Sequence, residues 1–397
     1  MSTRRASAPS ARTARTAVGP PPTVSAILFV GFAIASIGGP IALVTLLPGA
    51  AGESVDSAGL VVLLALCIFA APLAVWLAYS RRVVSPGGLS AFVAAAAGRH
   101  AALAQGWIWA FAYFLYLPYT VTFVVYDVLA PVFPGIAPYR ASLELLLPVA
   151  LVAVALAPLR PVLAGLGILA CGQLFVMLLL ATIVHSHTGT TFATHTELRG
   201  TGKAAATTAL LFFCSSLPLY LGGEVRGGSR TVRLGVFGAV AIVGGVFFVS
   251  AIPLAHVPSE QLDAAVPGVA VAQAYSGRGL AVAVGLLTAG SMLALIVAEY
   301  LALARLLHWL HGPPVRSVLR WIAVPFVAAD AVSLLNPDRF YTDLLKPSLA
   351  ALFVSQIIVF VVFPRFRQGW LAIACASIAS GLAGWGLYMV LAGSAST

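Results

Sequence analysis

Charged side chains are scarce in this sequence. Only 9% of its 397 residues are Asp, Glu, Lys or Arg, whereas a soluble domain carries roughly a quarter. This scarcity excludes a soluble enzyme, a disordered chain and a nucleic-acid-binding protein that neutralises phosphates with clustered cations. Cysteine is also rare, and the four cysteines lie within apolar runs, where they behave as small hydrophobic residues. They therefore predict neither a disulfide framework nor a redox compartment.

Catalytic motifs are absent as well. The sequence has no Ser-His-Asp grouping, no glycine loop that would cradle a phosphate and no paired-carboxylate motif. His185, His187 and His195 lie close together in sequence but lack a carboxylate or a fourth ligand at close range, so they do not predict a metal site. We therefore expect no enzymatic activity, no cofactor, no metal site and no nucleic-acid partner.

Apolar residues, by contrast, make up 60% of the chain. Because a membrane-spanning helix needs about 20 predominantly apolar residues, the composition predicts an all-α polytopic membrane protein. Residues 1–22 are expected to be a disordered basic tail, since they contain four arginines and no acid. Residues 23–397 form the predicted transmembrane domain. Its eleven predicted helices are 24–49, 59–79, 101–129, 142–158, 161–184, 204–226, 233–254, 279–307, 317–335, 341–363 and 369–391.

The positive charges indicate how the chain is oriented in the membrane. If the tail is cytoplasmic, 16 of the 22 Lys and Arg residues fall on the cytoplasmic side and six fall outside, as the positive-inside rule requires. An odd number of helices then places the C-terminus outside. We expect an integral protein of the inner or plasma membrane, whose excess positive charge lies on the rim that attracts anionic lipid.

Two of the predicted helices contain helix breakers near their midpoints. The first carries Ser36-Ile37-Gly38-Gly39-Pro40, and the sixth carries Cys214-Ser215-Ser216-Leu217-Pro218. Such breaks are tolerated at mid-membrane depth where the freed backbone groups line a cavity, and breaks at matching positions of two halves indicate a transporter built from inverted repeats. The repeats would be residues 24–184 and 204–363, with an extra helix at 369–391. The alternative is that Gly and Pro merely kink these helices or let neighbours pack closely.

The loop after the second helix resembles that of a known transporter family. Its sequence Ser85-Pro86-Gly87-Gly88-Leu89-Ser90-Ala91-Phe92-Val93, followed by Gly98-Arg99 and Gly106-Trp107, is similar to the loop between helices two and three of amino-acid permeases. The family is the amino acid, polyamine and organocation superfamily. The broken first helix agrees with it, as do the stretches Glu224 to Val232 and Ala298 to Arg305. The resemblance covers roughly residues 24–363.

The resemblance implies a leucine-transporter-like fold of two inverted five-helix repeats plus one extra helix, with an amino acid or amine bound at the two breaks. The chain departs from the family in having eleven helices where many members have twelve, and in having Gly227-Gly228 where Asn-Pro is usual. Many members carry an aromatic residue, a glycine or a carboxylate where this chain has Ser215, Ser216 and Leu217. A cationic substrate would then lack a counter-ion, so we predict a neutral amino acid.

Helix-end chemistry gives the breaks a role in binding a zwitterion. Half-helices that begin after Gly39 and after Leu217 would point N–H groups and positive dipole ends into the cavity, which suits a carboxylate. Carbonyl groups freed at the preceding residues suit an ammonium group. The predicted substrate site comprises Ala35, Ser36, Gly38, Gly39, Phe213, Cys214, Ser215 and Ser216.

Aromatic residues are the candidates for a gate. The family places a bulky aromatic residue beside the sixth break, where this chain has Phe212 and Phe213. Tyr113, Tyr116 and Tyr119 share one face of the third helix at spacings of three, and Tyr116 is the gate candidate among them. The alternative for this stripe is ordinary packing against neighbouring helices.

Ionisable residues within or at the ends of the predicted helices are the candidates for coupling, because a buried charge is costly in a membrane. These residues are Glu299, Asp330 and Glu224. If Glu299 lies beneath the first break, it would take up a proton in one state and release it in the other. The alternative for Glu299 is a static ion pair with Arg305 or Arg226.

Sodium is the other candidate coupling ion. Thr288 and Ser291 share a face of the eighth helix with Glu299, and their hydroxyl groups could coordinate sodium beside the first break. The alternative is that they only hydrogen-bond to the carbonyl groups of their own helix. The sequence leaves the choice between H⁺ and Na⁺ open.

Together these features predict a secondary active transporter, a permease that moves an amino acid by alternating access around broken helices one and six. Two alternatives stay open: an efflux exchanger for an amino acid or amine, and a non-transporting membrane sensor or assembly subunit with a permease fold. The expected partners are a small-molecule substrate, a coupling ion and membrane lipid. No nucleotide-binding motif is present, so a gradient or exchange must drive transport.

Overall fold

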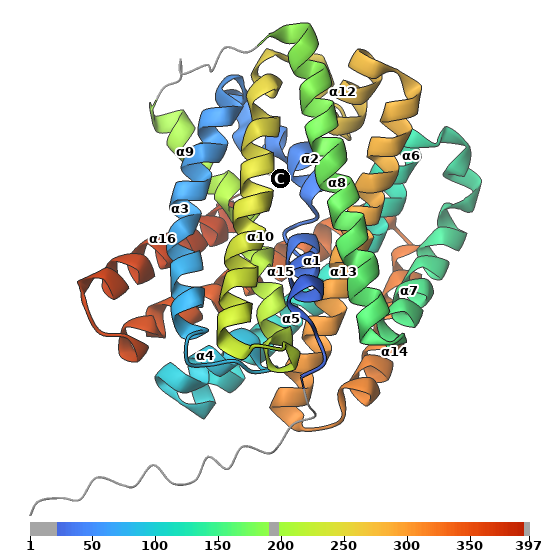
Figure 1. Ribbon diagram of the computed structural model, residues 1–397. Helices are drawn as coiled ribbons and strands as arrows, with labels where there is room; N and C mark the ends of the chain where they lie inside the picture. Colours follow the sequence, from blue (N-terminus) through green and yellow to red (C-terminus); the bar gives the residue numbers. More distant parts are fainter. Residues whose placement is uncertain (1–21, 190–197, 393–397) are drawn as a thin grey trace, which may run out of the picture.

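The computed structural model describes residues 22–189 and 198–392, and these residues form a bundle of helices (Figure 1). No strand is present in the described residues, where the one extended contact is an isolated parallel bridge between Val24 and Val225. The predicted disordered tail, except for its last residue, lies outside the described residues. So do His195 and the C-terminal Thr397.

The first half of the chain contains eight α-helices, two 3₁₀ helices and one π-helical segment. The α-helices are α1 (Ala26–Ala35), α2 (Pro40–Ala51), α3 (Ala58–Tyr79), α4 (Gly88–Ala97), α5 (Arg99–Phe123), α6 (Ala130–Val132), α7 (Arg140–Leu156) and α8 (Leu159–Thr188). The 3₁₀ helices are η1 (Gly52–Ser57) and η3 (Pro134–Tyr139), and η2 (Val124–Leu129) is a π-helical segment that continues α5.

The second half of the chain contains another eight α-helices. They are α9 (Leu198–Leu210), α10 (Gly228–Ala251), α11 (Ser259–Leu262), α12 (Pro267–Ser276), α13 (Arg278–His311), α14 (Val315–Ser333), α15 (Pro337–Phe366) and α16 (Trp370–Ala392). Two 3₁₀ helices, η4 (Phe213–Glu224) and η5 (Ile252–His256), follow α9 and α10.

Ten helical segments of the described chain are long and apolar enough to cross a membrane. They correspond to ten of the eleven predicted helices, and the remaining one is α14, which is a helix at the predicted place. It carries Arg316, Arg320 and Asp330 within 19 residues, which lowers its apolar character. Its outward face is nevertheless apolar, because Trp321 and Val324 are 67% and 73% exposed.

The break in the first spanning helix occurs where the sequence predicts it. Helix α1 ends at Ala35, and α2 begins at Pro40. Gly38 and Gly39 join them with φ angles of +59° and +64°, a left-handed conformation that costs a residue with a side chain about 1–2 kcal/mol. Glycine at both positions is therefore what allows the chain to turn between the two half-helices.

The break in the sixth spanning helix lies earlier than the sequence predicts. Helix α9 ends at Leu210, and the second half is a 3₁₀ helix that begins at Phe213, so the prediction of a half-helix that starts after Leu217 is wrong. The hydroxyl groups of Ser215 and Ser216 donate to carbonyl oxygens three residues earlier. These bonds match the i to i−3 spacing of a 3₁₀ helix, so the serines sit inside the tight helix instead of separating two halves.

The broken first helix lies at the centre of the bundle. Helices α1 and α2 run between α8, α10 and α13 (Figure 1). Gly31 of α1 faces Gly167 of α8 so closely that a Cβ atom on Gly31 would lie 2.9 Å from the Gly167 Cα atom. Small residues at helix contacts let backbones approach in this way.

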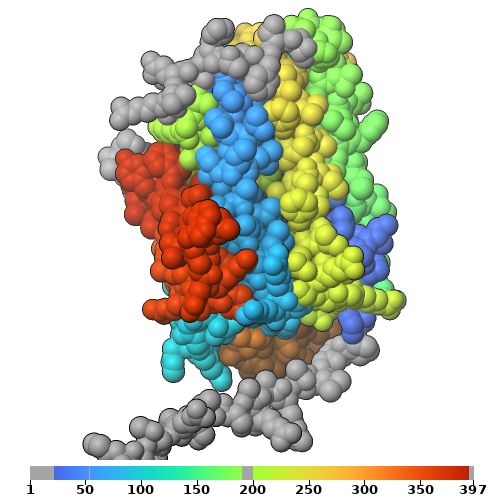
Figure 2. All heavy atoms as spheres, turned by 60° about the vertical axis from the view of Figure 1, so that its left-hand side comes forward, coloured from blue at the N-terminus to red at the C-terminus, as the bar shows by residue number. Residues whose placement is uncertain are grey.

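Helix α16 packs on the outside of the bundle. It follows α15 along the chain and lies against α3. The space-filling view shows it beside α3 (Figure 2). The Trp385 side chain donates to the Thr207 hydroxyl of α9 over 3.2 Å. This helix therefore closes one side of the bundle next to the second broken helix.

Candidate functional site

A cavity of about 340 Å³ lies in the middle of the bundle, between the two broken helices. Its wall is formed by α2, α5, α9, η4, α13, α15 and α16. The lining residues are Gly38, Leu43, Leu46, Ala50, Ala112, Tyr113, Tyr116, Thr207, Leu210, Leu211, Phe213, Cys214, Met292, Leu295, Glu299, Ser348, Leu349, Leu352, Phe353, Gly386, Met389 and Val390. The wall is mostly apolar, and Glu299 is the one charged side chain among these residues.

Three of the eight predicted substrate-site residues line this cavity. They are Gly38 from the first break and Phe213 and Cys214 from the second. The structure therefore brings both breaks to one cavity, although they are separated by about 175 residues of sequence.

The three predicted site serines lie at the breaks but do not line the cavity. Each hydroxyl donates to a backbone carbonyl of its own segment: Ser36 to Phe32 over 2.7 Å, Ser215 to Phe212 over 2.6 Å and Ser216 to Phe213 over 3.0 Å. All three serines are buried. Their hydroxyl groups thus stabilise the irregular backbone instead of facing the cavity.

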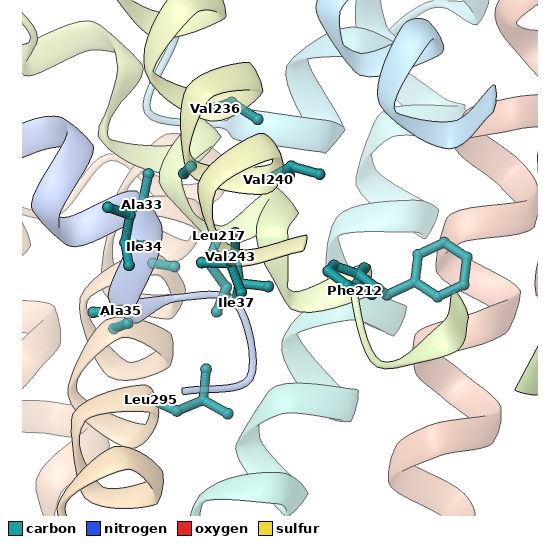
Figure 3. Close-up of a cluster of buried hydrophobic side chains, with 14 of the residues drawn as sticks. Ala33, Ile34, Ala35, Ile37, Phe212, Leu217, Val236, Val240, Val243 and Leu295 are labelled. Atoms are coloured by element: carbon teal, nitrogen blue, oxygen red, sulfur yellow. The ribbon is translucent and has the colours of Figure 1, made fainter. Parts of the chain in front are cut away.

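Apolar packing surrounds the remaining residues of the first break. Ala35 and Ile37 lie in a buried cluster with Leu217 of η4 and Val243 of α10 (Figure 3). Gly39 lies directly against Ser291 of α13, because a Cβ atom built on Gly39 would overlap the serine side chain. Neither Ala35 nor Gly39 lines the cavity.

The backbone of the first break offers a carbonyl group without its helical donor and the positive end of a helix dipole. Pro40 has no N–H, so the Ser36 carbonyl lacks the donor that a continuous helix would supply four residues on. At the start of α2, the Ala42 amide donates back to the Gly39 carbonyl over 3.0 Å. The positive end of the α2 dipole lies beside Gly38, which lines the cavity, and this end favours a negatively charged group.

The two gate phenylalanines face different environments. The Phe213 ring lines the cavity and lies 6.0 Å from the ring of Phe353, another lining residue. The Phe212 ring instead packs against Phe69 at 5.3 Å and Phe247 at 6.1 Å, in the core between α3 and α10. The gate prediction for Phe212 does not fit this placement, because its side chain points away from the cavity.

Tyr116, the third gate candidate, lines the cavity together with Tyr113. Its ring also lies 5.2 Å from that of Tyr119, which stacks on Tyr341 of α15 at 4.8 Å. The tyrosine stripe therefore has two parts: Tyr113 and Tyr116 face the cavity, and Tyr119 packs between helices.

The three coupling candidates lie in three separate places. Glu299 is fully buried at the cavity, and neither of its carboxylate oxygens has a hydrogen-bond partner. Glu224 instead accepts from Arg305 over 2.6 Å, so the ion pair suggested for Glu299 forms with a different acid. Asp330 is buried in α14, outside the cavity.

The hydroxyl groups proposed to coordinate sodium are also buried without partners. Thr288 and Ser291 are fully buried, and their hydroxyl oxygens have no hydrogen-bond partner among the described residues. Ser291 lies against Gly39, next to the backbone of the first break. Oxygen atoms are the donors that hard cations such as Ca²⁺ and Mg²⁺ prefer, and sodium binding by these two hydroxyl groups stays a prediction.

Sequence reasoning missed the contribution of the last helix to the cavity. Gly386, Met389 and Val390 of α16 line it, although this helix was expected to be an addition outside the two repeats. A signal was available in the spacing of these residues, because positions three and four apart share one face of a helix. Nothing in the sequence indicated which neighbour that face would contact.

The sequence matches no protein-family model and no curated protein. Its structure, however, is similar to solved structures. One is MhsT in complex with L-phenylalanine, with a TM-score of 0.66 and 14% identity over 94% of this chain and 99% of that chain. Another is the manganese transporter of Eremococcus coleocola in complex with an aromatic bis-isothiourea substituted compound, with a TM-score of 0.53 and 14% identity over 93% and 87%.

These similarities, together with the helical architecture, show that the chain has the leucine-transporter-like fold predicted from its sequence. The ten apolar spans make it an integral membrane protein. At 14% identity the likeness concerns the fold alone.

Proposed function

We propose that this protein is a secondary active transporter for an amino acid, which binds in the central cavity and crosses the membrane by alternating access. The observation that carries this proposal is the position of Glu299, a buried carboxyl group without a partner, in a cavity between two broken helices. Sites of this kind, near the membrane midplane and at helix breaks, are where secondary transporters bind substrate. The transporter among the structurally similar proteins supports transport over enzymatic activity.

The lining of the cavity favours a zwitterion with an apolar side chain. Glu299 would pair with the ammonium group, and the start of α2 beside Gly38 would favour the carboxylate. Leu43, Met292 and Leu352 belong to an apolar wall that would contact the side chain. The L-phenylalanine bound to the similar protein MhsT is a molecule of this chemical class.

A divalent metal ion is a less suitable cargo. One of the structurally similar proteins is a manganese transporter, but the described residues of this chain contain no group of three His, Cys, Asp or Glu side chains that could hold a metal ion. Glu299 would have to bind such an ion without a second carboxylate. An amine is the better match to a single buried acid.

The burial of the Glu299 carboxyl group in the cavity also supports proton coupling. A carboxyl group in a low-dielectric cavity is most stable in its neutral form until a cation arrives. A proton and the substrate's ammonium group would therefore compete for the same carboxylate. This competition favours exchange of substrate against protons, so an efflux exchanger is the second candidate function. Sodium bound by Thr288 and Ser291 is the alternative source of coupling.

The resemblance of the loop Ser85 to Val93 supports membership of the amino acid, polyamine and organocation superfamily. The distribution of Lys and Arg supports a location in the inner or plasma membrane with the tail in the cytoplasm and the C-terminus outside. We include both the superfamily and the membrane orientation in the proposal.

The proposal is tested with the purified full chain in proteoliposomes. We expect uptake and counterflow of a labelled neutral, apolar amino acid from a panel of amino acids and amines, driven by an imposed pH gradient or by exchange. Glu299→Gln should lose the response to the pH gradient and bind substrate more weakly. The matched control is Glu260→Gln, because Glu260 is an exposed acid on α11.

Three results would change the conclusion. If no panel member binds or exchanges, the protein is a sensor or subunit with a transporter fold. If transport follows a sodium gradient and ignores the pH gradient, coupling belongs to Thr288 and Ser291. If Glu299→Gln transports and responds to pH like the Glu260→Gln control, Glu299 has no role in coupling.

A further inference from the structure

A second group of buried polar side chains lies outside the central cavity, where α7 and α14 pack side by side at the edge of the bundle (Figure 1). Its two acids are Glu144 of α7 and Asp330 of α14, and both are fully buried. The Ser333 hydroxyl lies 2.7 Å from Glu144 Oε1 and 2.6 Å from the backbone carbonyl of Asp330. The Thr122 hydroxyl of α5 donates to the same Glu144 oxygen.

The two carboxyl groups differ in how their oxygens are satisfied. Glu144 Oε1 has two hydroxyl groups within hydrogen-bond distance, those of Thr122 and Ser333, whereas Glu144 Oε2 has no partner. Both carboxyl oxygens of Asp330 are buried without any hydrogen-bond partner. Hydrogen bonds to a carboxylate stabilise its negative charge, whereas a buried carboxylate without them is strongly disfavoured. The surroundings therefore stabilise a negative charge on Glu144 better than on Asp330.

No cationic side chain neutralises this pair within the described residues. Arg140 lies one helical turn before Glu144, but its guanidinium group lies over the ring of Tyr126, 5.2 Å from the centroid. The described ion pairs join Arg305 to Glu224 and Arg339 to Asp343. A pair of buried acids without a cation is expected to hold at least one proton.

The titratable groups on the neighbouring elements add no positive charge that would neutralise the two acids. From η2, Tyr126 and Asp127 line a cavity that Thr122 also lines, and from α15 Asp338 and Tyr341 line the same cavity. From α13, the Tyr300 hydroxyl donates to the Leu319 carbonyl of α14, so it is already engaged. These groups are phenols and acids, and none of them supplies a positive charge at neutral pH.

A small cavity lies next to Thr122, one of the two residues whose hydroxyl groups contact Glu144. It has a volume of about 210 Å³ and is lined by Thr122 together with Tyr126, Asp127, Asp338 and Tyr341. Thr122 therefore contacts the cavity on one side and bonds to Glu144 on the other. Acidic residues around a cavity raise the local concentration of cations, including protons.

We propose that Glu144 and Asp330 form a proton-binding pair, with the proton on Asp330 and with exchange through the cavity that Thr122 lines. A proton that enters the cavity would pass by way of the Thr122 hydroxyl to Glu144. The Ser333 hydroxyl, which contacts Glu144 Oε1 and the backbone carbonyl of Asp330, would then turn toward the Asp330 carboxyl group to complete the path. Its release follows the same path in reverse. The site lies away from the cavity proposed to bind substrate, and the proposal does not depend on transport.

Infrared spectroscopy of the purified full chain in liposomes tests the proposal directly, because a protonated carboxyl group has a carbonyl stretching band that a carboxylate lacks. We expect such a band at neutral pH, and Asp330→Asn should remove part of it. Glu144→Gln should keep the Asp330 band, because the proposed proton lies on Asp330. Glu299→Gln serves as a control that removes a different buried carboxyl group.

Carbodiimide labelling of the unmodified protein gives a second measurement that does not depend on the folding of a variant. The reagent adds to protonated carboxyl groups, and peptide mass spectrometry locates the adduct. We expect labelling of Asp330 that falls at alkaline pH. The proposal is overturned if Asp330→Asn leaves the infrared band unchanged and Asp330 is not labelled. It is also overturned if sodium at constant pH abolishes the band, because the pair would then be a sodium site.

Discussion

Gly39 of the first break lies directly against Ser291 of α13, so closely that a Cβ atom on Gly39 would come within 2.8 Å of the Ser291 Cβ atom. Gly39 also has a φ of +64°, in the left-handed region. Two requirements therefore meet at one residue: a backbone conformation that suits glycine and a contact that leaves no room for a side chain.

Gly39→Ala is expected to weaken substrate binding by roughly tenfold or more, since left-handed strain of about 1–2 kcal/mol and the overlap with Ser291 both displace the break. Binding of a labelled amino acid to purified protein measures this effect. The control is Gly49→Ala on α2, where a Cβ atom would meet nothing within 4 Å. Equal affinities for the two variants would show that the break is an ordinary kink.

Adding Ser291→Gly to Gly39→Ala should recover part of the lost affinity. The second change removes the overlapping side chain but leaves the backbone strain at residue 39. Full recovery would mean that only the overlap matters. No recovery would assign the whole effect to backbone strain.

Arg305→Met is expected to destabilise the protein by about 1–3 kcal/mol. Arg305 is 4% exposed and donates to Glu224 on η4 over 2.6 Å, so the change leaves an acid without its partner. Breaking a fully buried pair costs about 3–5 kcal/mol, and the expected value is smaller because Glu224 is 31% exposed. The midpoint of thermal unfolding in detergent measures the effect.

The exposed pair Arg339 and Asp343 provides the matched control for that measurement. These side chains are 79% and 66% exposed and lie four residues apart on α15. Arg339→Met should cost only about 0.3–0.5 kcal/mol, the usual value for such a pair on a helix surface. Similar losses for both arginine variants would contradict a structural role for the contact between Arg305 and Glu224.

Gly386→Val is expected to shift the substrate preference toward smaller amino acids. A Cβ atom on Gly386 would lie 2.6 Å from the ring of Phe353, which lines the central cavity. The added side chain would push this ring inward and reduce the space for substrate. The ratio of binding constants for a large and a small apolar amino acid measures the shift.

Gly384→Val on the same helix is the control for Gly386→Val, because a Cβ atom at Gly384 would meet nothing within 4 Å. If both variants change the ratio equally, α16 does not form a wall of the substrate site.

A reporter fused at Thr397 tests the proposed orientation. With eleven spanning helices and a cytoplasmic tail, a reporter that is active only outside the cytoplasm should be active. The proposed orientation follows from the excess of Arg and Lys residues on the side assigned to the cytoplasm. Activity of a cytoplasm-dependent reporter at the same position would require an even number of spans, and α14 would be the first helix to reconsider because of its three charged residues.

The sequence by itself determined the fold class and the first break. Long apolar runs can only be spanning helices, because backbone groups in lipid must be satisfied within the segment. Gly38, Gly39 and Pro40 are local signals, since the conformational freedom of glycine and the missing N–H of proline act on the backbone where they occur. This is why the predicted interruption between Ala35 and Pro40 agrees with the structure.

Only the tertiary structure decided what the polar residues of the breaks and of the helices contact. A serine in an irregular helix can bond to its own backbone or face a cavity, and the sequence of Ser215 and Ser216 is the same in both cases. The partner of Glu224 is 81 residues away in Arg305, and Glu144 meets Ser333 across 189 residues. Contacts between helices depend on how the bundle packs, so helical periodicity identified the face that carries Glu299 but not the cavity to which that face turns.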